Sequence, residues 1–234
     1  MNHHINITRV KAVYNALDEL KDKVVFVGGA TVSLYADRMA AEIRETSDVD
    51  ILIELYKRKD YIELEEQLRK KGFESDSSAK FVGRFKIQGI VVDVMPTIEE
   101  VLGFSNRWYI DGYSNAIDYT IDEQCTVKIF TGPYFIASKI EAFKGRGKRG
   151  DGELDGRFSQ DFEDIVFVLE NRRAIWEEMK SAKPELRDYL LNEFKSLYKN
   201  PYIEEWISSH SSSYSPPSVY FIMENIEEFI GFNS

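Results

Sequence analysis

Two stretches of the sequence place carboxylates where a strand should be apolar. Asp48 and Asp50 are separated by one residue in the strand-like run DVDILIE, and Asp93 is the single acid within IVVDVMP. Residues two apart in a strand point to the same face, so Asp48 and Asp50 project together. A buried lone carboxylate is costly unless it is paired, protonated or bound to metal. If the two strands are neighbours, the three acids converge, and a divalent cation would offset their mutual repulsion.

Carboxylate oxygens with open positions beside them suit one metal in particular. Mg²⁺ prefers oxygen ligands, retains several waters and accepts the phosphates of a substrate. We therefore expect Asp48, Asp50 and Asp93 to be metal ligands. The structural alternative is that Asp48 and Asp50 are ordinary acids on a solvated face, while Asp93 pairs with an arginine such as Arg84.

The apolar run VVFV ends at a glycine pair that could form a binding turn for an anionic group. Gly28 and Gly29 break the predicted strand, and a helix is predicted after them. Bare backbone at such a turn lets an anionic group approach closely, and the helix N-terminus offers it unpaired N–H donors. Thr31 and Ser33 add hydroxyl groups, although a tight turn also favours glycine for steric reasons alone. A phosphate-binding turn, an Asp-x-Asp strand and a third Asp are the parts needed for metal-assisted nucleotidyl transfer.

These residues need a sheet to position them, and the sequence pattern predicts one. Helices are predicted at residues 8–20, 31–41 and 57–71, and strands at 24–27, 49–53, 80–87, 90–94 and 124–130. Later helices are predicted at 134–143, 158–171, 174–180, 184–198 and 219–230. We therefore expect an α/β (α+β) fold, with a mixed sheet flanked by helices in a catalytic domain at residues 1–130 and a helical C-terminal domain at 131–234.

Composition narrows the class of protein. The chain has 234 residues and a net charge of −10, which weighs against a protein whose whole surface follows a nucleic-acid backbone. The single Cys125 fits a reducing compartment, and no apolar run reaches the roughly 20 residues that cross a bilayer. We expect a cytoplasmic protein with no membrane partner. The 3 histidines lie near the N-terminus and in a Ser-rich loop, so chemistry should depend on carboxylates, lysine or metal.

The combination of motifs resembles the nucleotidyltransferase superfamily that includes DNA polymerase β-type enzymes. VGG at residues 27–29 and DVD at 48–50 carry that resemblance. More narrowly, the strings GGATVSLY, IRETSDVDILIE and GRFKIQGIVVDVMP are similar to those of AbiEii-type nucleotidyltransferases, the toxins of type IV toxin–antitoxin systems. Lys139 in ASKIEAFKGR, and Asp161 with Asp164 in FSQDFEDI, match further motifs of that family. Gly29 stands where some members have a serine.

The resemblance implies a role for each matched residue. Asp48 and Asp50 would hold a Mg²⁺ that bridges the nucleoside triphosphate, and Asp93 would complete a second Mg²⁺ position and help to activate the acceptor hydroxyl. Lys139 would neutralise triphosphate charge, and Asp161 would orient Lys139 or contact the nucleotide. The structural alternatives are a surface lysine and solvated acids in the first turn of a helix. The remaining expected nucleotide-binding residues are Gly28, Gly29, Thr31, Ser33 and Arg44, the last with a structural salt bridge as an equal alternative.

We therefore expect an enzyme, a Mg²⁺-dependent nucleotidyltransferase that moves a nucleoside monophosphate from an NTP to an acceptor hydroxyl. The resemblance implies an AbiEii-like toxin acting on tRNA, with a cognate antitoxin as a possible partner. Two alternatives stay open. One is a small-molecule transferase acting on aminoglycoside-type antibiotics, which the acidic composition mildly favours, and the other is an inactive nucleotide-binding module. The glycine-rich segment 144–157 lacks the phosphate-loop pattern and is predicted to be a flexible connector, with a basic lid as its alternative.

Overall fold

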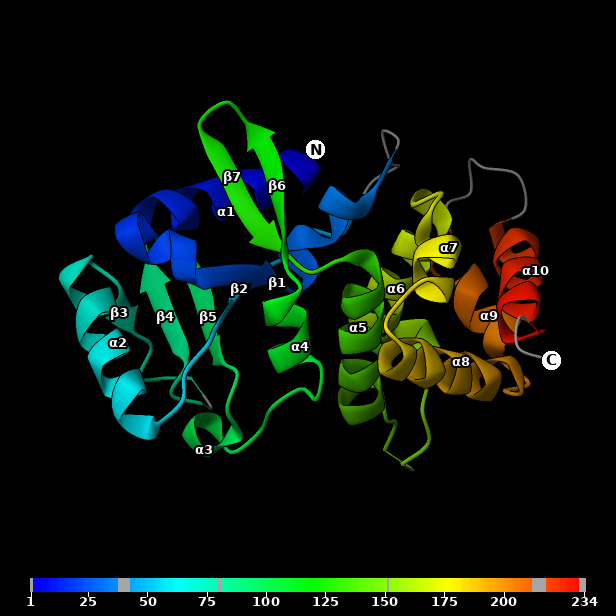
Figure 1. The fold of residues 1–234 in the computed structure, drawn as a ribbon. Helices are drawn as coiled ribbons and strands as arrows, with labels where there is room; N and C mark the ends of the chain where they lie inside the picture. Colours follow the sequence, from blue (N-terminus) through cyan, green and yellow to red (C-terminus); the bar gives the residue numbers. More distant parts are fainter. Residues whose placement is uncertain (1, 38–42, 80, 151, 212–217, 232–234) are drawn as a thin grey trace. The chain divides into compact units, whose positions relative to one another are not determined.

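A computed structural model describes residues 2–37, 43–79, 81–150, 152–211 and 218–231 of the chain (Figure 1). Two compact units divide it. The first, here called the sheet unit, comprises Met1–Leu34 and Glu42–Thr131, and the second, the helical unit, comprises Tyr35–Ala41 and Gly132–Ser234. The sheet unit is therefore built from two separate parts of the chain. No helix among the described residues combines the length and the apolar character needed to cross a membrane.

The sheet unit contains a mixed sheet of seven strands in the order β3-β4-β5-β2-β1-β7-β6. The strands are β1 Val24–Val27, β2 Asp48–Ile53, β3 Glu74–Ser75, β4 Arg84–Ile87, β5 Ile90–Pro96, β6 Ile117–Asp122 and β7 Cys125–Ile129. β2 runs parallel to β5, and β1 runs parallel to β7, while the other neighbours are antiparallel. This arrangement confirms the predicted mixed α/β architecture.

The central strands follow from the apolar runs of the sequence. All residues of β1 are buried, which explains why its sequence is apolar without alternation. β4 and β5 form a hairpin whose two turn residues, Gln88 and Gly89, both have positive φ angles of 51° and 79°. Two-residue hairpin turns of this kind match the twist of the strands. The turn thereby determines which residue of β4 lies opposite each residue of β5.

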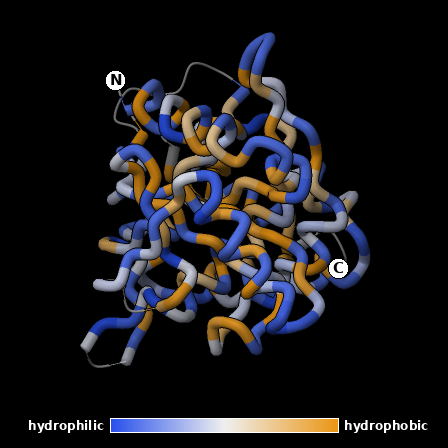
Figure 2. The backbone as a smooth tube through the Cα atoms, turned by 90° about the vertical axis from the view of Figure 1, so that its left-hand side faces the viewer, coloured by the Kyte–Doolittle hydropathy of each residue, from blue (hydrophilic) through white to orange (hydrophobic). Residues whose placement is uncertain are grey.

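Helices cover the sheet and carry apolar residues towards it. Those of the sheet unit are α1 Asn2–Leu17, α2 Arg58–Lys70, α3 Glu99–Leu102 and α4 Tyr109–Ser114, with the 3₁₀ helix η1 Asp18–Lys23. α1 packs on β2, β5 and β7, and its Val10, Val13 and Leu17 are fully buried. Burial of such a stripe drives helix packing in water. Along the tube in Figure 2, the protruding turns are mostly hydrophilic.

The helix predicted at residues 31–41 is a 3₁₀ helix instead, η2 Gly29–Tyr35. Its first hydrogen bond joins the Thr31 amide to the Gly28 carbonyl oxygen, three residues back, as 3₁₀ geometry requires. The β-branched residues Thr31 and Val32 lower the α-helical propensity of this segment. Residues 38–41 of the predicted helix lie outside the described residues.

The helical unit buries a core rich in aromatic residues. Its helices are α5 Gly132–Arg146, α6 Gln160–Asn171, α7 Ile175–Lys180, α8 Pro184–Tyr198, α9 Ile203–Ser208 and α10 Ser218–Gly231, with the 3₁₀ helix η3 Gly156–Phe158. The segment predicted as a connector folds back on itself, since Lys148 and Leu154 form an antiparallel bridge. The Asp155 amide also donates to the Gly147 carbonyl oxygen at 2.9 Å. Asp151 within it lies outside the described residues.

Candidate functional site

Asp48, Asp50 and Asp93 lie on one face of the sheet, here called the aspartate face. In the parallel pairing of β2 with β5, Asp50 stands directly opposite Asp93, and Asp48 lies two residues before Asp50. Residues that are opposite each other, or two apart, project from the same side of a sheet. Asp93 is buried, with 4% of its surface exposed, whereas the Asp48 side chain is 32% exposed. β2 and β5 are therefore neighbours, as predicted.

A guanidinium lies among these carboxylates. Arg84 of β4 stands opposite Asp93 of β5 in the antiparallel hairpin. Its Nε donates to Asp93 Oδ1 at 2.7 Å and its Nη2 to Asp93 Oδ2 at 2.6 Å, which makes a two-pronged ion pair. The same Nη2 also donates to Asp48 Oδ2 at 3.3 Å. The alternative pairing of Asp93 with Arg84 is thus the arrangement in this structure.

Electrostatics keep Arg84 charged. Its hydrogen bonds to Asp93 raise the pKa of the guanidinium, against the opposing effect of burial, and the charges of Asp93, Asp48 and Asp50 raise it further. All three acids of the aspartate face therefore act on one cation. Their combined negative charge is offset in part, which makes a buried Asp93 tolerable.

Gly28 forms the corner against which Asp50 packs. Val27, the last residue of β1, is paired with Asp50, and Gly28 follows with a φ angle of 73°. A Cβ atom at position 28 would lie 2.8 Å from Asp50 Cγ and closer still to its Oδ2. Glycine is required here both by the backbone conformation and by the carboxylate that occupies the space of a side chain.

The hydroxyl residues after the glycine pair have different surroundings. Thr31 is fully buried, and its Oγ1 donates to the Gly28 carbonyl oxygen at 2.9 Å, so its proton is used within the turn. Ser33 is 8% exposed, and its Oγ has no hydrogen-bond partner among the described residues. Buried hydroxyl groups are normally satisfied. Ser33 is therefore the better-placed of the two for a polar ligand, while the binding roles of both stay predictions.

The segment that leads into β2 is anchored by residues of α1 that the sequence did not reveal. Asn6 is fully buried; its side-chain amide donates to the Arg44 carbonyl oxygen at 3.0 Å and its Oδ1 accepts from the Thr46 amide at 3.0 Å. Arg9 donates to the Thr46 carbonyl oxygen. These contacts hold the chain just before Asp48. One signal was available, because Asn6 is a polar residue on the apolar stripe of a helix.

Lys139, Asp161 and Asp164 form a buried ion cluster within the helical unit. Lys139 Nζ lies 3.2 Å from Asp161 Oδ1 and 2.6 Å from Asp164 Oδ2, and the three side chains are 8%, 8% and 3% exposed. Arg146 donates to both oxygens of Asp161 at 2.8 Å. The expected contact of Asp161 with Lys139 is present, and Lys139 is not a surface residue. Roles for these residues in nucleotide binding stay predictions.

The aspartate face suits a divalent cation in two respects. Its side chains are carboxylates, and they project from the same side of the sheet. All ligand atoms would be carboxylate oxygens, which Mg²⁺ prefers. In the described part of the chain, no three His, Cys, Asp or Glu side chains are arranged to hold a metal ion. The cation that Asp48 and Asp93 contact is the guanidinium of Arg84. Metal binding here stays a prediction.

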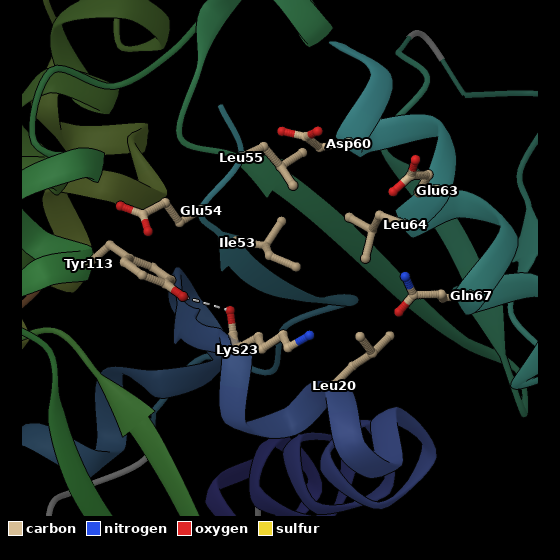
Figure 3. Close-up of a pocket in the computed structure, with 10 residues that line it drawn as sticks. All are labelled: Leu20, Lys23, Ile53, Glu54, Leu55, Asp60, Glu63, Leu64, Gln67 and Tyr113. Atoms are coloured by element: carbon tan, nitrogen blue, oxygen red, sulfur yellow. Dashed lines mark hydrogen bonds between the residues drawn. The ribbon is translucent and has the colours of Figure 1, made fainter. Parts of the chain in front are cut away.

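A separate pocket of about 380 Å³ opens near the other end of β2 (Figure 3). Its floor is apolar, with Ile53 and Leu64, and its rim carries Glu54 and Glu63. The Tyr113 hydroxyl donates to a backbone carbonyl oxygen at the rim at 2.9 Å. None of the predicted site residues lines this pocket.

No protein-family model matches the sequence, and no curated protein matches it. Among solved structures, an antigenic nucleotidyltransferase-like protein from Paracoccidioides brasiliensis is similar at 20% identity and a TM-score of 0.47, over 86% of this chain and 92% of that chain. The CdnE cyclic dinucleotide synthase of Elizabethkingia meningoseptica, solved with GTP and Apcpp, is similar at 12% identity and a TM-score of 0.30, over 99% of this chain and 91% of that chain. With identities and TM-scores this low, function must be inferred from the residues of this chain.

Proposed function

We propose that this protein is a nucleotidyltransferase, which transfers a nucleoside monophosphate from an NTP to an acceptor hydroxyl. The observation that supports it best is the register of β2 with β5, where Asp50 stands opposite Asp93 beside the Gly28 corner. Three carboxylates on one face, next to a glycine turn that leads into a 3₁₀ helix, match the needs of metal-assisted phosphoryl chemistry. Asp48, Asp50 and Asp93 are the proposed ligands of Mg²⁺.

In this proposal the residues of the chain bind and orient the triphosphate, and one of them accepts a proton from the acceptor hydroxyl. Mg²⁺, when bound, supplies positive charge at the triphosphate. Asp48 and Asp50 would hold the Mg²⁺ that binds the triphosphate, and Asp93 would accept the proton of the acceptor hydroxyl. The hydroxyl oxygen then forms a bond to the α-phosphorus while the bond to pyrophosphate breaks. Backbone N–H groups after Gly28, together with Ser33, contact the phosphate oxygens.

A narrower proposal concerns the acceptor. The resemblance of Lys139, Asp161 and the DVD motif to AbiEii-type enzymes supports a toxin that modifies tRNA and is held in check by an antitoxin. The net charge of −10 favours instead a cationic small molecule, such as an aminoglycoside-type antibiotic. The two acceptors predict opposite effects on the growth of cells that express the protein. A toxin arrests growth, whereas an antibiotic-modifying enzyme protects the cells from the antibiotic.

A transfer assay tests the proposal. Purified protein is incubated with α-³²P-labelled NTPs and Mg²⁺, with total tRNA in one series and aminoglycosides in another. We expect label in one acceptor class, and a loss of at least about 100-fold in Asp93→Asn, because removal of a proton acceptor costs that much. Asp118→Asn is the matched control, since Asp118 is an exposed strand acid that pairs with Lys128. Absence of label in every acceptor, or equal labelling by Asp93→Asn, contradicts the proposal.

A further inference from the structure

Arg84 is a cation that lies among the aspartates of the aspartate face. Its guanidinium bridges carboxylates from two strands, at 2.6 Å from Asp93 Oδ2 and 3.3 Å from Asp48 Oδ2. We propose that Arg84 is the internal cation of the aspartate face, which a divalent ion must displace, so that Arg84 sets the metal affinity of this site. The inference rests on the proposed function, because it concerns the same three carboxylates.

The hydrogen bonds of Asp93 show why a metal ion and Arg84 compete. Both oxygens of Asp93 accept from Arg84, one from Nε and one from Nη2. A divalent ion bound to Asp93 and Asp48 would therefore lie beside a guanidinium that contacts the same oxygens. Two cations at such a distance repel strongly where water is partly excluded. Metal binding must then break or lengthen the Arg84 contacts.

Burial explains why the sheet keeps this cation. The Asp93 side chain is 6% exposed, and a carboxylate so buried needs a partner in the absence of metal. The guanidinium of Arg84 is that partner, and it contacts Asp48 as well. Arg84 thereby stabilises the folded chain before any ion arrives.

Arg84 also contacts an aromatic ring. Its side chain is 31% exposed, and its guanidinium carbon lies 5.7 Å from the centre of the Phe81 ring. Arginine rests favourably on an aromatic face, so this ring adds to the contacts that hold the guanidinium beside Asp93 and that a metal ion would have to disturb. Phe81 is itself supported by Phe104, whose ring centre lies 6.0 Å away.

Manganese binding measures the competition directly. Mn²⁺ is titrated into metal-free protein without nucleotide, and the free ion is followed by electron paramagnetic resonance. We expect Arg84→Gln to lower the Kd for Mn²⁺ at least about tenfold, because it removes a like charge from the site. Arg84→Lys should lie between the two, since a lysine keeps the charge but not the two-pronged contact. Arg69→Gln is the matched control, because Arg69 is an exposed arginine of α2 that pairs with Glu65 and donates to Ser75, away from the three aspartates.

The inference is overturned if Arg84→Gln binds Mn²⁺ no more tightly than the wild type, or if neither of them binds the ion. Should Arg84→Gln fail to fold without metal, Arg84→Lys decides, and equal affinity with the wild type overturns the inference. We also expect added Mn²⁺ to raise the Tm of Arg84→Gln by more than that of the wild type. Tighter Mn²⁺ binding without any nucleotidyl transfer would support this inference while contradicting the proposed function.

Discussion

At the scale of single residues, the aspartate face depends on side chains that leave room for one another. Gly28 illustrates this, because Asp50 occupies the space that a side chain at position 28 would need. The Asp-x-Asp spacing predicted the common face of Asp48 and Asp50 from strand periodicity alone. The contact of Arg84 was one of two alternatives. Its register was implicit in the turn at Gln88, because counting back equally from both sides of that turn pairs position 84 with position 93.

Gly28→Ala should be more destabilising than its backbone conformation alone explains. Gly89→Ala is a matched control, since Gly89 has a similar φ angle of 79° but no atom near its missing Cβ. Both variants incur the strain of a positive φ angle, and only Gly28→Ala must also displace the Asp50 carboxylate. We expect the free energy of unfolding to fall by at least about 1 kcal/mol more in Gly28→Ala, measured by urea denaturation. Equal losses would mean that Asp50 does not pack on this corner.

The buried cluster around Lys139 predicts a second effect. Asp164→Asn leaves the Lys139 ammonium with less compensating charge in an almost fully buried place. We expect a loss of about 3 kcal/mol in the free energy of unfolding, because breaking one side of a buried ion pair leaves an unpaired charge. In a Lys139→Met background the same substitution should cost clearly less. Additive losses in the double-mutant cycle would show that Lys139 and Asp164 are not coupled.

At the scale of elements, strongly patterned segments were predictable and those stabilised by tertiary contacts were not. The strands β1, β2 and β5 follow from apolar runs, and α8 follows from a proline at its first turn and an apolar stripe. β6 was missed because it is a polar, largely exposed strand that exists through its pairing with β7. α4 was missed because of its central Gly112, whose missing side chain makes room for the Phe130 ring.

The loop before α6 predicts a dependence of stability on pH. Arg157 donates to both oxygens of Asp155, and these hydrogen bonds lower the pKa of Asp155 to about 2. Because the folded pKa lies below the ordinary 3.8, the contact contributes fully above about pH 4 and is lost as the pH falls towards 2. Asp155→Asn should therefore be less stable than the wild type at pH 7, with a difference that shrinks towards zero near pH 2.

The matched variant Arg157→Gln removes the partner instead of the acid, and it should reproduce this curve in thermal unfolding. A difference between wild type and Asp155→Asn that stays constant from pH 7 to pH 2 would show that the ionised form of Asp155 is not what stabilises the loop.

At the scale of the whole molecule, the compact units do not follow the chain in two simple halves. Tyr35–Ala41 belongs to the helical unit although it lies between two parts of the sheet unit in sequence. Tyr35 is 2% exposed, and its ring centre lies 4.4 Å from that of Phe135. Sequence patterns report local structure, so an excursion of this kind is not visible in them. The catalytic assignment of residues 1–130 stays a prediction.

Tyr35 should therefore be a stability residue of the helical unit. Tyr35→Ala is expected to lower the free energy of unfolding by about 3 kcal/mol, because it removes a buried aromatic ring and leaves a cavity. Tyr220→Ala serves as the control, since Tyr220 is 68% exposed and its loss should change stability by less than about 0.5 kcal/mol. Urea unfolding followed by circular dichroism measures the stability of both variants. Similar midpoints for Tyr35→Ala and Tyr220→Ala would contradict a role for Tyr35 in the core.

The proposed function requires that the aspartate face bind a nucleotide through a metal ion. Isothermal titration of the intact chain with a non-hydrolysable NTP analogue tests this most directly, with and without Mg²⁺, in the wild type and in Asp50→Asn. We predict binding heat in the wild type that disappears when Mg²⁺ is removed. In Asp50→Asn the Kd for the analogue should rise at least about tenfold. Binding that persists without Mg²⁺ and is unchanged in Asp50→Asn would contradict the account.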